Sequence, residues 1–257
     1  MGLDASTMVG SVALVTDGVV EGEYTLKVKR THSERLLPAV ERVLEDAELT
    51  FRDVDAIAVA IGPGSFTGLR IALATAKGLA YAAGLPVIGV GTLDALAAPW
   101  RWFPGLIVPM IDARRGEVYA AIYRGGLKDH GMPGAPGGLE VVVEPVASPL
   151  TDLLRLVEGV DGAPVVVTGD GAVKHWQAIF AVLGDRAVLA PDAAAISRGS
   201  WVAELGKQKL DASGPDNVFQ LSPLYLRPPE AEIKWERAKA RSGGEIVHEQ
   251  LATERQR

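Results

Sequence analysis

The sequence predicts an α/β fold built from two halves, and three observations lead to this prediction. Short uncharged runs, typical of buried strands, alternate with segments whose apolar residues recur at helical spacing. The alternation starts again after Trp102-Phe103-Pro104. The chain has 257 residues, which fits one large domain or two of about 100 to 150 residues. We expect an N-terminal half over residues 1–103, a C-terminal half over 104–229, and a charged tail over 230–257 that is a frayed helix or disordered.

Two strands joined by a tight turn begin the first half. Residues 8–15 form an apolar run, Asp17-Gly18 is typical of a tight turn, and residues 19–28 alternate like a returning strand. Residues 2–7 resemble the end of a further strand, which is short and therefore expected to be weak or incomplete. The next predicted elements are a helix from about Glu34 to Ala47, a strand at 56–61, a helix from about Thr67 to Ala83, a strand at 87–90 and a helix that starts within 92–98.

The start of the first predicted helix has its own signal. Residues Thr31 to Glu34 fit a capping box, in which a hydroxyl and a carboxylate satisfy free N–H groups reciprocally. Pro38 lies too deep for the first helical position, so we expect a kink or a late helix start.

The second half repeats the alternation around a long loop. Residues 125–138 are rich in glycine and proline, which predicts a surface loop. The predicted elements are strands at 106–111, 117–123, 141–143 and 165–168, a helix near 150–157 and a helix after Gly171.

The composition excludes several classes of function. The absence of cysteine excludes disulfides, thiolate catalysis and cysteine-ligated metal clusters, and it fits a reducing cytoplasm. With 26 Lys and Arg against 32 Asp and Glu, the net charge of −6 argues against direct nucleic-acid binding. Neither a signal peptide nor a membrane-spanning run is recognisable. We expect a soluble cytoplasmic protein that does not engage a membrane.

The segment from Gly62 to Gly68, Gly-Pro-Gly-Ser-Phe-Thr-Gly, joins a predicted strand to a predicted helix. A glycine-rich turn at a helix N-terminus presents free N–H groups and suits an anion. It is not a Walker A sequence, because no lysine follows the glycines. The segment is therefore either an anion site or a tight turn in which Ser65 or Thr67 caps the helix.

The helix after this turn carries small residues on two faces. One ridge at i+4 spacing holds Gly68, Ala72, Ala76, Ala80 and Gly84, and another holds Arg70, Ala74, Gly78 and Ala82. Small residues let another backbone approach closely, so packing on the chain's own sheet and contact with another subunit both stay open. If the first ridge contacts a subunit, a large charged residue at Ala72 or Ala76 should abolish that contact and leave the monomer folded.

Two acidic segments resemble the phosphate hairpins of actin-like ATPases. Asp4, with the hydroxyls of Ser6 and Thr7, resembles the first hairpin, and Asp112 lies where the second is expected. The second hairpin normally reads Asp-x-Gly, because a missing side chain admits phosphate. Here Arg114 takes the glycine position, where it either pairs with phosphate or blocks its approach.

A third turn could complete a nucleotide site. Gly169 and Gly171 either face an adenosine or form the turn into a helix. The candidate nucleotide-binding residues are Asp4, Ser6, Thr7, Asp112, Gly169 and Gly171. Such a site, either degenerate or shared with a partner, would take ATP or ADP with magnesium, although the sequence gives no reason to require a cofactor.

No metal site or hydrolase site is recognisable. The four histidines are His32, His130, His175 and His248; they are far apart, and no H-E-x-x-H pair exists. A G-x-S-x-G turn and a nucleophile–base pair are also missing. We expect neither a metal site nor catalytic residues.

The glycine-rich turn also carries a resemblance to a known family. Residues 62–71, Gly-Pro-Gly-Ser-Phe-Thr-Gly-Leu-Arg-Ile, closely resemble the signature of the bacterial TsaB (YeaZ) family. Further matching segments follow in family order along nearly the whole chain: His32-Ser33-Glu34, Leu37-Pro38, Gly91 to Leu96, Asp112 to Tyr119, and Pro223 to Arg227.

This resemblance implies an actin/hexokinase/Hsp70-like (ASKHA) fold without a catalytic centre of its own. Proteins of the family pair with TsaD, a paralogue of the same fold, and work with the ATPase TsaE. The assembly installs N6-threonylcarbamoyladenosine (t6A) beside the anticodon of tRNAs that read codons beginning with A, and TsaD is the transferase. The resemblance therefore implies a required, non-catalytic subunit that meets tRNA only through the complex.

The resemblance also implies where the partner binds. The helices of the family's N-terminal half form a dimer contact with TsaD, or with a second copy when the protein is isolated. Carried onto this chain, the interface residues are Leu36, Leu37, Val40, Val43, Leu44, Phe66, Leu69, Arg70, Ala72, Leu73, Ala76, Lys77 and Ala80. The alternative is a stand-alone actin-like ATPase or small-molecule kinase that uses Asp4 and Asp112.

Overall fold

The computed structural model describes residues 1–27, 35–126, 139–160 and 162–227. Every described residue except Arg227 belongs to one compact unit, Met1–Leu226, and Arg227 begins a second unit. The predicted capping box, the predicted tail and most of the predicted loop at 125–138 lie outside the described residues.

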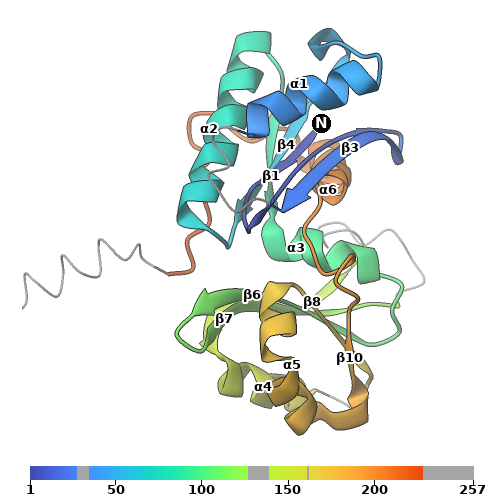
Figure 1. Cartoon of the computed structure of the whole chain (residues 1–257), viewed down its shortest axis with the longest axis vertical. Helices are drawn as coiled ribbons and strands as arrows, with labels where there is room; N and C mark the ends of the chain where they lie inside the picture. Colours follow the sequence, from blue (N-terminus) through green and yellow to red (C-terminus); the bar gives the residue numbers. More distant parts are fainter. Residues whose placement is uncertain (28–34, 127–138, 161, 228–257) are drawn as a thin grey trace, which may run out of the picture. The chain divides into compact units, whose positions relative to one another are not determined.

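Five strands form the first sheet, in the order β3-β2-β1-β4-β5 (Figure 1). They are β1 (Gly2–Asp4), β2 (Val9–Thr16), β3 (Val19–Lys27), β4 (Ile57–Gly62) and β5 (Val87–Gly91). β1 pairs antiparallel with β2 on one side and parallel with β4 on the other. The N-terminal strand is short, as expected, yet it occupies the centre of the sheet, where it has a partner on each side.

Helices cover both faces of this sheet (Figure 1). α1 (Leu36–Asp46) and α2 (Phe66–Ala83) pack on the face that bears Val59, and α6 (Gly199–Ser213) packs on the face that bears Ala58. Successive side chains of a strand point to opposite faces, so neighbouring residues of β4 serve the two layers.

The first helix starts late, as one of the two outcomes expected from Pro38. Its first residue is Leu36, which places Pro38 in the first turn. The first four N–H groups of a helix have no partner within it, so a proline there removes no intrahelical hydrogen bond.

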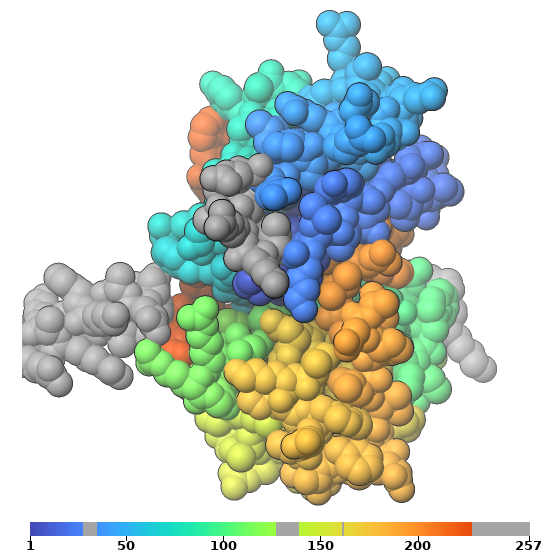
Figure 2. All heavy atoms as spheres, in the orientation of Figure 1, coloured from blue at the N-terminus to red at the C-terminus, as the bar shows by residue number. Residues whose placement is uncertain are grey.

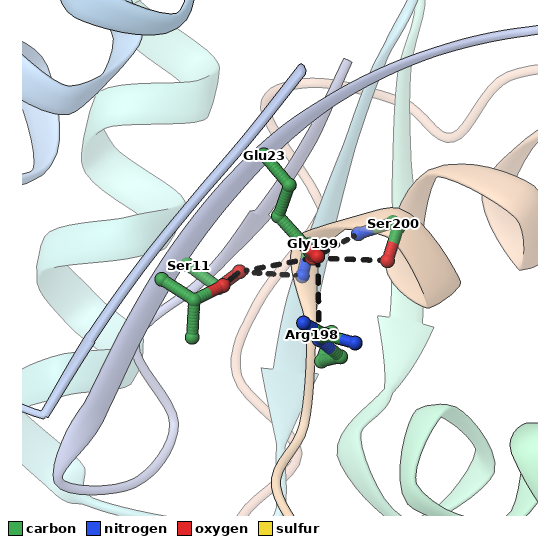
Figure 3. A network of polar contacts seen from close by, with 6 residues as sticks. Ser11, Glu23, Arg198, Gly199 and Ser200 are labelled. Atoms are coloured by element: carbon green, nitrogen blue, oxygen red, sulfur yellow. Dashed lines mark hydrogen bonds and ion pairs between the residues drawn. The ribbon is translucent and has the colours of Figure 1, made fainter. Parts of the chain in front are cut away.

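α6 begins at a cluster of polar contacts (Figure 3). The Glu23 carboxylate on β3 accepts hydrogen bonds from the N–H (3.2 Å) and the hydroxyl (2.9 Å) of Ser200, and it pairs with Arg198 (3.2 Å). The Ser11 hydroxyl oxygen on β2 accepts the N–H of Gly199 at 2.8 Å. Free N–H groups at a helix start need acceptors, and a carboxylate favours that end of the helix dipole. These contacts therefore fix α6 to the first sheet.

Five strands also form the second sheet, in the order β10-β9-β6-β7-β8. They are β6 (Leu106–Arg114), β7 (Glu117–Arg124), β8 (Glu140–Pro149), β9 (Val165–Thr168) and β10 (Ala187–Leu189). β6, β9 and β10 run parallel, whereas β7 is antiparallel to both of its neighbours.

Three helices accompany the second sheet. α4 (Leu150–Gly159) and α5 (Asp170–Leu183) pack on one face. α3 (Thr92–Ala97) packs on the other face and also contacts β4 and α6, so it lies between the two sheets (Figure 1).

Two five-stranded mixed sheets with flanking helices confirm the predicted actin/hexokinase/Hsp70-like (ASKHA) fold class. The boundaries of the halves stay a prediction; α6, which lies in the segment 104–229, packs on the first sheet. None of the described helices has the length and apolar character needed to cross a membrane.

Candidate functional site

The glycine-rich turn packs tightly against the chain that follows β1. Ser65 caps α2, because its hydroxyl oxygen accepts the N–H of Gly68 at 3.3 Å, and its own N–H donates to the Ser6 carbonyl at 2.6 Å. A Cβ on Gly68 would collide with the Ala5 carbonyl oxygen, and one on Gly64 would collide with that of Ser6. The glycines thus permit two backbones to approach closely. Of the two alternatives, this arrangement is the tight turn with Ser65 as the cap.

Asp4 is covered rather than presented to a cleft. Its Oδ1 accepts the N–H of Ser6 at 2.6 Å, and its Oδ2 accepts the hydroxyl of Ser197. The side chain is almost fully buried. The Thr7 hydroxyl oxygen accepts the N–H of Val9 at 3.1 Å. The three residues predicted for the first hairpin do lie together. The Asp4 carboxylate and the Thr7 hydroxyl are engaged within the protein, whereas the buried Ser6 hydroxyl has no hydrogen-bond partner among the described residues.

Asp112 is held by a network at the end of β6. Its Oδ2 pairs with Lys174 at 2.6 Å, and its Oδ1 accepts the N–H of Arg114 at 3.0 Å. Its own N–H donates to Asp170 at 3.1 Å. Burial raises the pKa of Asp112, but the hydrogen bonds from Lys174 and Arg114 outweigh it and hold this pKa below its usual value. Burial raises the pKa of Asp170.

The two predicted adenosine-facing glycines pack against β6. A Cβ on Gly169 would collide with the Met110 carbonyl oxygen, and one on Gly171 would lie 3.0 Å from the backbone of Met110 and Ile111. Gly169 also has a φ of +94°. Close backbone packing at the turn into α5 thus accounts for both glycines.

A pocket of about 230 Å³ lies where β6 meets the segments after β1 and β9 and the segment before α6. Its walls are mostly apolar, and they include Met8, Leu96, Ile111 and Ile196. Of the six predicted nucleotide-binding residues, Thr7 and Gly169 line it, whereas Asp4 and Asp112 do not. In this arrangement neither carboxylate is presented to a metal–phosphate group. The described residues also contain no group of three or more acidic or histidine side chains suited to a metal ion.

The predicted interface residues divide into a buried set and an exposed set. Nine of them are buried in the core between α1, α2 and the first sheet: Leu36, Val40, Val43, Leu44, Leu69, Ala72, Leu73, Ala76 and Ala80. Leu37, Phe66 and Arg70 are exposed, and Lys77 is half-buried. Apolar spacing identified the helices, but the same spacing describes a face packed on its own sheet. The interface itself stays a prediction, carried by its exposed members.

The prediction that the monomer stays folded with a large charged residue at Ala72 or Ala76 is therefore wrong. Both side chains are 0% exposed. A large charged residue at either position would enter the core, where an unpaired charge is strongly destabilising, so the monomer would not stay folded. The second ridge, Arg70, Ala74, Gly78 and Ala82, is the one that faces outward.

The outer face of α2 carries an aromatic and cationic cluster. The Arg70 guanidinium carbon lies 3.9 Å above the Phe66 ring, and Arg70 Nε donates to the Tyr225 hydroxyl at 3.0 Å. The Phe66 and Tyr225 rings stack with centroids 5.3 Å apart. Farther along the helix, Tyr81 meets Phe219 edge to face at 6.1 Å.

Tyr225 and Phe219 belong to residues 214–226, which we call the C-terminal strap. The strap is tied to the sheet by hydrogen bonds from the N–H of Asp216 to Val87 (3.0 Å) and from the N–H of Leu224 to Ile61 (2.7 Å). Its atoms lie beside those of α2 in Figure 2. The strap was missed as part of this surface, although the segment Pro223 to Arg227 had marked it as a family feature.

Comparison with known proteins places the chain in a family. A family model described as "TsaD: tRNA N6-adenosine threonylcarbamoyltransferase" matches residues 23–131. The tRNA threonylcarbamoyladenosine biosynthesis protein TsaB of Bacillus subtilis is 39% identical over 235 residues, which cover 91% of this chain and 96% of that protein. The chain belongs to the TsaB family. The predicted family, and with it the link to tRNA threonylcarbamoyladenosine biosynthesis, is confirmed.

Another TsaB protein and two solved structures support this family assignment. TsaB of Haemophilus influenzae is 33% identical over 245 residues, covering 94% of this chain and 97% of that protein. A crystal structure of a Pseudomonas aeruginosa protein, described as similar to peptidase YEAZ, has a TM-score of 0.72 at 30% identity and covers 88% of this chain and 97% of that one. YeaZ from the same organism has a TM-score of 0.69 at 29% identity, with 87% and 97% covered.

Proposed function

We propose that this TsaB-family chain is a non-catalytic subunit of the assembly that installs t6A in tRNA. In this proposal it binds TsaD, and with the ATPase TsaE it supports transfer of the threonylcarbamoyl group by TsaD to the adenosine beside the anticodon. The chain reaches tRNA through the complex, in the cytoplasm, and requires no cofactor of its own.

The engagement of two carboxylates, those of Asp4 and Asp112, carries the proposal. Asp4 is covered by Ser197, and Asp112 is paired with Lys174. A phosphoryl-transfer site would need such groups free to hold a metal ion and orient phosphate. A protein that keeps this fold while both carboxylates are engaged is better suited to binding and positioning a catalytic partner than to transferring a phosphoryl group itself.

The outer face of α2 supports the partner half of the proposal. Its exposed ridge of small residues permits close approach of another helix, and Phe66, Arg70 and Tyr225 stand beside it. The TsaD family model matches residues 23–131, a range that includes α1 and α2. TsaD is thus expected to offer a related pair of helices, and a second copy of this chain would use the same face when TsaD is absent.

Reconstitution tests the proposal. Purified TsaD, TsaE and tRNA are assayed with and without this chain, and t6A is quantified by mass spectrometry of the digested tRNA. We expect co-purification with TsaD and a modification that depends on the chain. Full modification without the chain, or failure to bind TsaD, would refute the proposal.

A second assay separates the proposal from the stand-alone kinase or ATPase. The isolated chain is titrated with ATP and magnesium by calorimetry and then assayed for released phosphate. Turnover by the isolated chain that is lost in Asp112→Asn would favour an enzyme in its own right.

A further inference from the structure

Arg70 is an exposed arginine whose side chain is already fixed. Phe66 supports one face of the guanidinium at 3.9 Å, and the Tyr225 hydroxyl accepts the hydrogen bond of Nε at 3.0 Å. Among the described residues, no hydrogen bond or ion pair engages the two terminal nitrogens of this group. The guanidinium therefore presents its outer edge, with its paired N–H donors, to whatever approaches α2.

This geometry favours a carboxylate. Two parallel N–H donors match the two oxygens of a carboxylate or a phosphate, which is why arginine dominates bidentate recognition of both. Because stacking and the Nε hydrogen bond orient the group beforehand, less rotamer freedom is lost on binding. Arginine and tyrosine held in this way are also the residue types that dominate the energetics of protein interfaces.

The charge of α2 also favours a carboxylate on the partner. α2 contains Arg70 and Lys77 and no acidic residue, whereas the chain as a whole has a net charge of −6. A cationic face on an acidic protein attracts a locally acidic surface and steers its approach. The complementary group on the partner is therefore an aspartate or glutamate.

The surroundings favour a protein over a nucleic acid. Arg70 lies between the exposed Phe66 ring and the next small exposed residues of the second ridge, Ala74 and Gly78. An apolar, closely packable border of this kind excludes water around a central polar contact, as in protein–protein hot spots. Nucleic-acid surfaces instead carry many cations spread along a phosphate track, and α2 offers only two.

We propose that Arg70, positioned by Phe66 and Tyr225, anchors the docking surface by binding a carboxylate side chain of TsaD through its terminal nitrogens. This inference rests on the proposed function and adds to it both the chemistry of the contact and the C-terminal strap. Tyr225 belongs to that strap, so the docking surface is composite: α2 supplies the arginine, and the strap holds it in place.

Binding of the full-length chain to purified TsaD tests this proposal by titration calorimetry. Arg70→Gln should weaken binding by roughly 30-fold or more, as expected for truncating one member of a buried charge pair. Arg70→Lys should restore only part of the loss, because lysine cannot form the bidentate contact. The matched control is Arg155→Gln on α4, an exposed arginine paired with Asp152 at 3.1 Å, which should bind like the wild type.

Tyr225→Phe tests the positioning role. Loss of the hydroxyl that accepts the Arg70 Nε hydrogen bond should weaken binding by roughly 3- to 10-fold, which corresponds to the usual contribution of one hydrogen bond. If Tyr225 acts through Arg70, the same change in the Arg70→Gln background should have no further effect, which a merely structural role would not produce. Melting temperatures of all variants, measured alongside, report whether each chain stays folded, and Arg70→Lys and Tyr225→Phe retain most of the packing.

The outcomes are distinguishable. If the wild type binds TsaD and Arg70→Gln binds equally well, this inference is overturned while the proposed function stands. If the wild type does not bind TsaD at all, both fail. If Arg70→Gln binds TsaD normally but lowers the affinity of the assembled complex for tRNA, Arg70 contacts phosphate, and the carboxylate assignment is wrong.

Discussion

Ser197 donates its hydroxyl hydrogen bond to the carboxylate of Asp4, which lies 193 positions earlier in the chain. Asp4 ends the central strand of the first sheet, and Ser197 lies two residues before the start of α6. The contact covers one of the two carboxylates that the sequence suggests for a metal–phosphate site. It also ties the central strand to the segment that leads into the helix packed beneath it.

Removing this hydroxyl should destabilise the protein. A buried carboxylate that loses one donor retains its desolvation penalty, so Ser197→Ala should lower the free energy of unfolding by about 1.5–3 kcal/mol. Ser213→Ala is the control, because that exposed hydroxyl only donates to the Lys209 carbonyl at 2.9 Å. Urea unfolding monitored by tryptophan fluorescence measures both. Equal stability of the two variants would show that Asp4 does not depend on Ser197.

Neighbouring positions of α2 should respond in opposite ways to a charge. Ala72 is 0% exposed and Ala74 is exposed. Ala72→Glu should destabilise by about 4 kcal/mol or more, because it places an unpaired charge in the core, and the protein should be recovered unfolded or aggregated. Ala74→Glu should fold with a nearly unchanged melting temperature. A folded, stable Ala72→Glu protein would contradict the packing of this helix on its own sheet.

The same two alanines show what the sequence could predict and what it could not. Helical spacing and the uncharged run at 56–61 identified α2 and β4, because burial on a sheet demands those patterns locally. Spacing does not distinguish a face packed on its own sheet from one packed on another subunit, since both are apolar and small. Nine interface predictions accordingly fell on core residues.

Other features could not be predicted from the sequence because they depend on contacts between residues far apart in the chain. The start of α6 has no local capping partner, because its first N–H groups are satisfied by Ser11 and Glu23, far away in the sequence. Arg70 was predicted as an interface residue, but its orientation depends on Tyr225, 155 positions later. Residue type and spacing single out Asp4, whereas its coverage by Ser197 follows from the fold alone.

The pair of Asp94 on α3 and Tyr123 on β7 should give stability a dependence on pH. The Tyr123 hydroxyl donates to Asp94 at 2.5 Å. Burial raises the pKa of Asp94 above its ordinary 3.8, the Tyr123 hydrogen bond opposes this rise, and the negative charge of Glu144 adds to it. A carboxyl whose pKa is higher in the folded state binds its proton more tightly there. Its contribution to stability is therefore complete below the unfolded pKa and is lost as the pH rises through the folded pKa.

Asp94→Asn isolates this contribution. The amide oxygen can still accept the Tyr123 hydroxyl, but it does not titrate. The free energy of unfolding of the wild type minus that of Asp94→Asn should be largest below the ordinary pKa of 3.8 and should fall as the pH rises through the raised folded pKa, with a slope of up to about 1.4 kcal/mol per pH unit. Urea titrations at intervals of half a pH unit would measure it, with the exposed Asp152→Asn as control. Parallel stability curves for the wild type and Asp94→Asn would rule out a raised pKa.

Two glycines of α2 should respond to alanine with opposite signs. Gly68 lies against the Ala5 carbonyl oxygen, where a Cβ would collide with backbone, whereas a Cβ on Gly78 would meet nothing within 4 Å. Gly68→Ala should therefore destabilise by about 3 kcal/mol or more, since the turn would have to separate from the chain after β1. Gly78→Ala should stabilise by about 0.5–1 kcal/mol, because alanine restricts the unfolded chain and suits a helix interior. Thermal unfolding of the two variants gives both signs, and a stabilising Gly68→Ala would mean that the family's glycine-rich turn is not the close backbone contact described above.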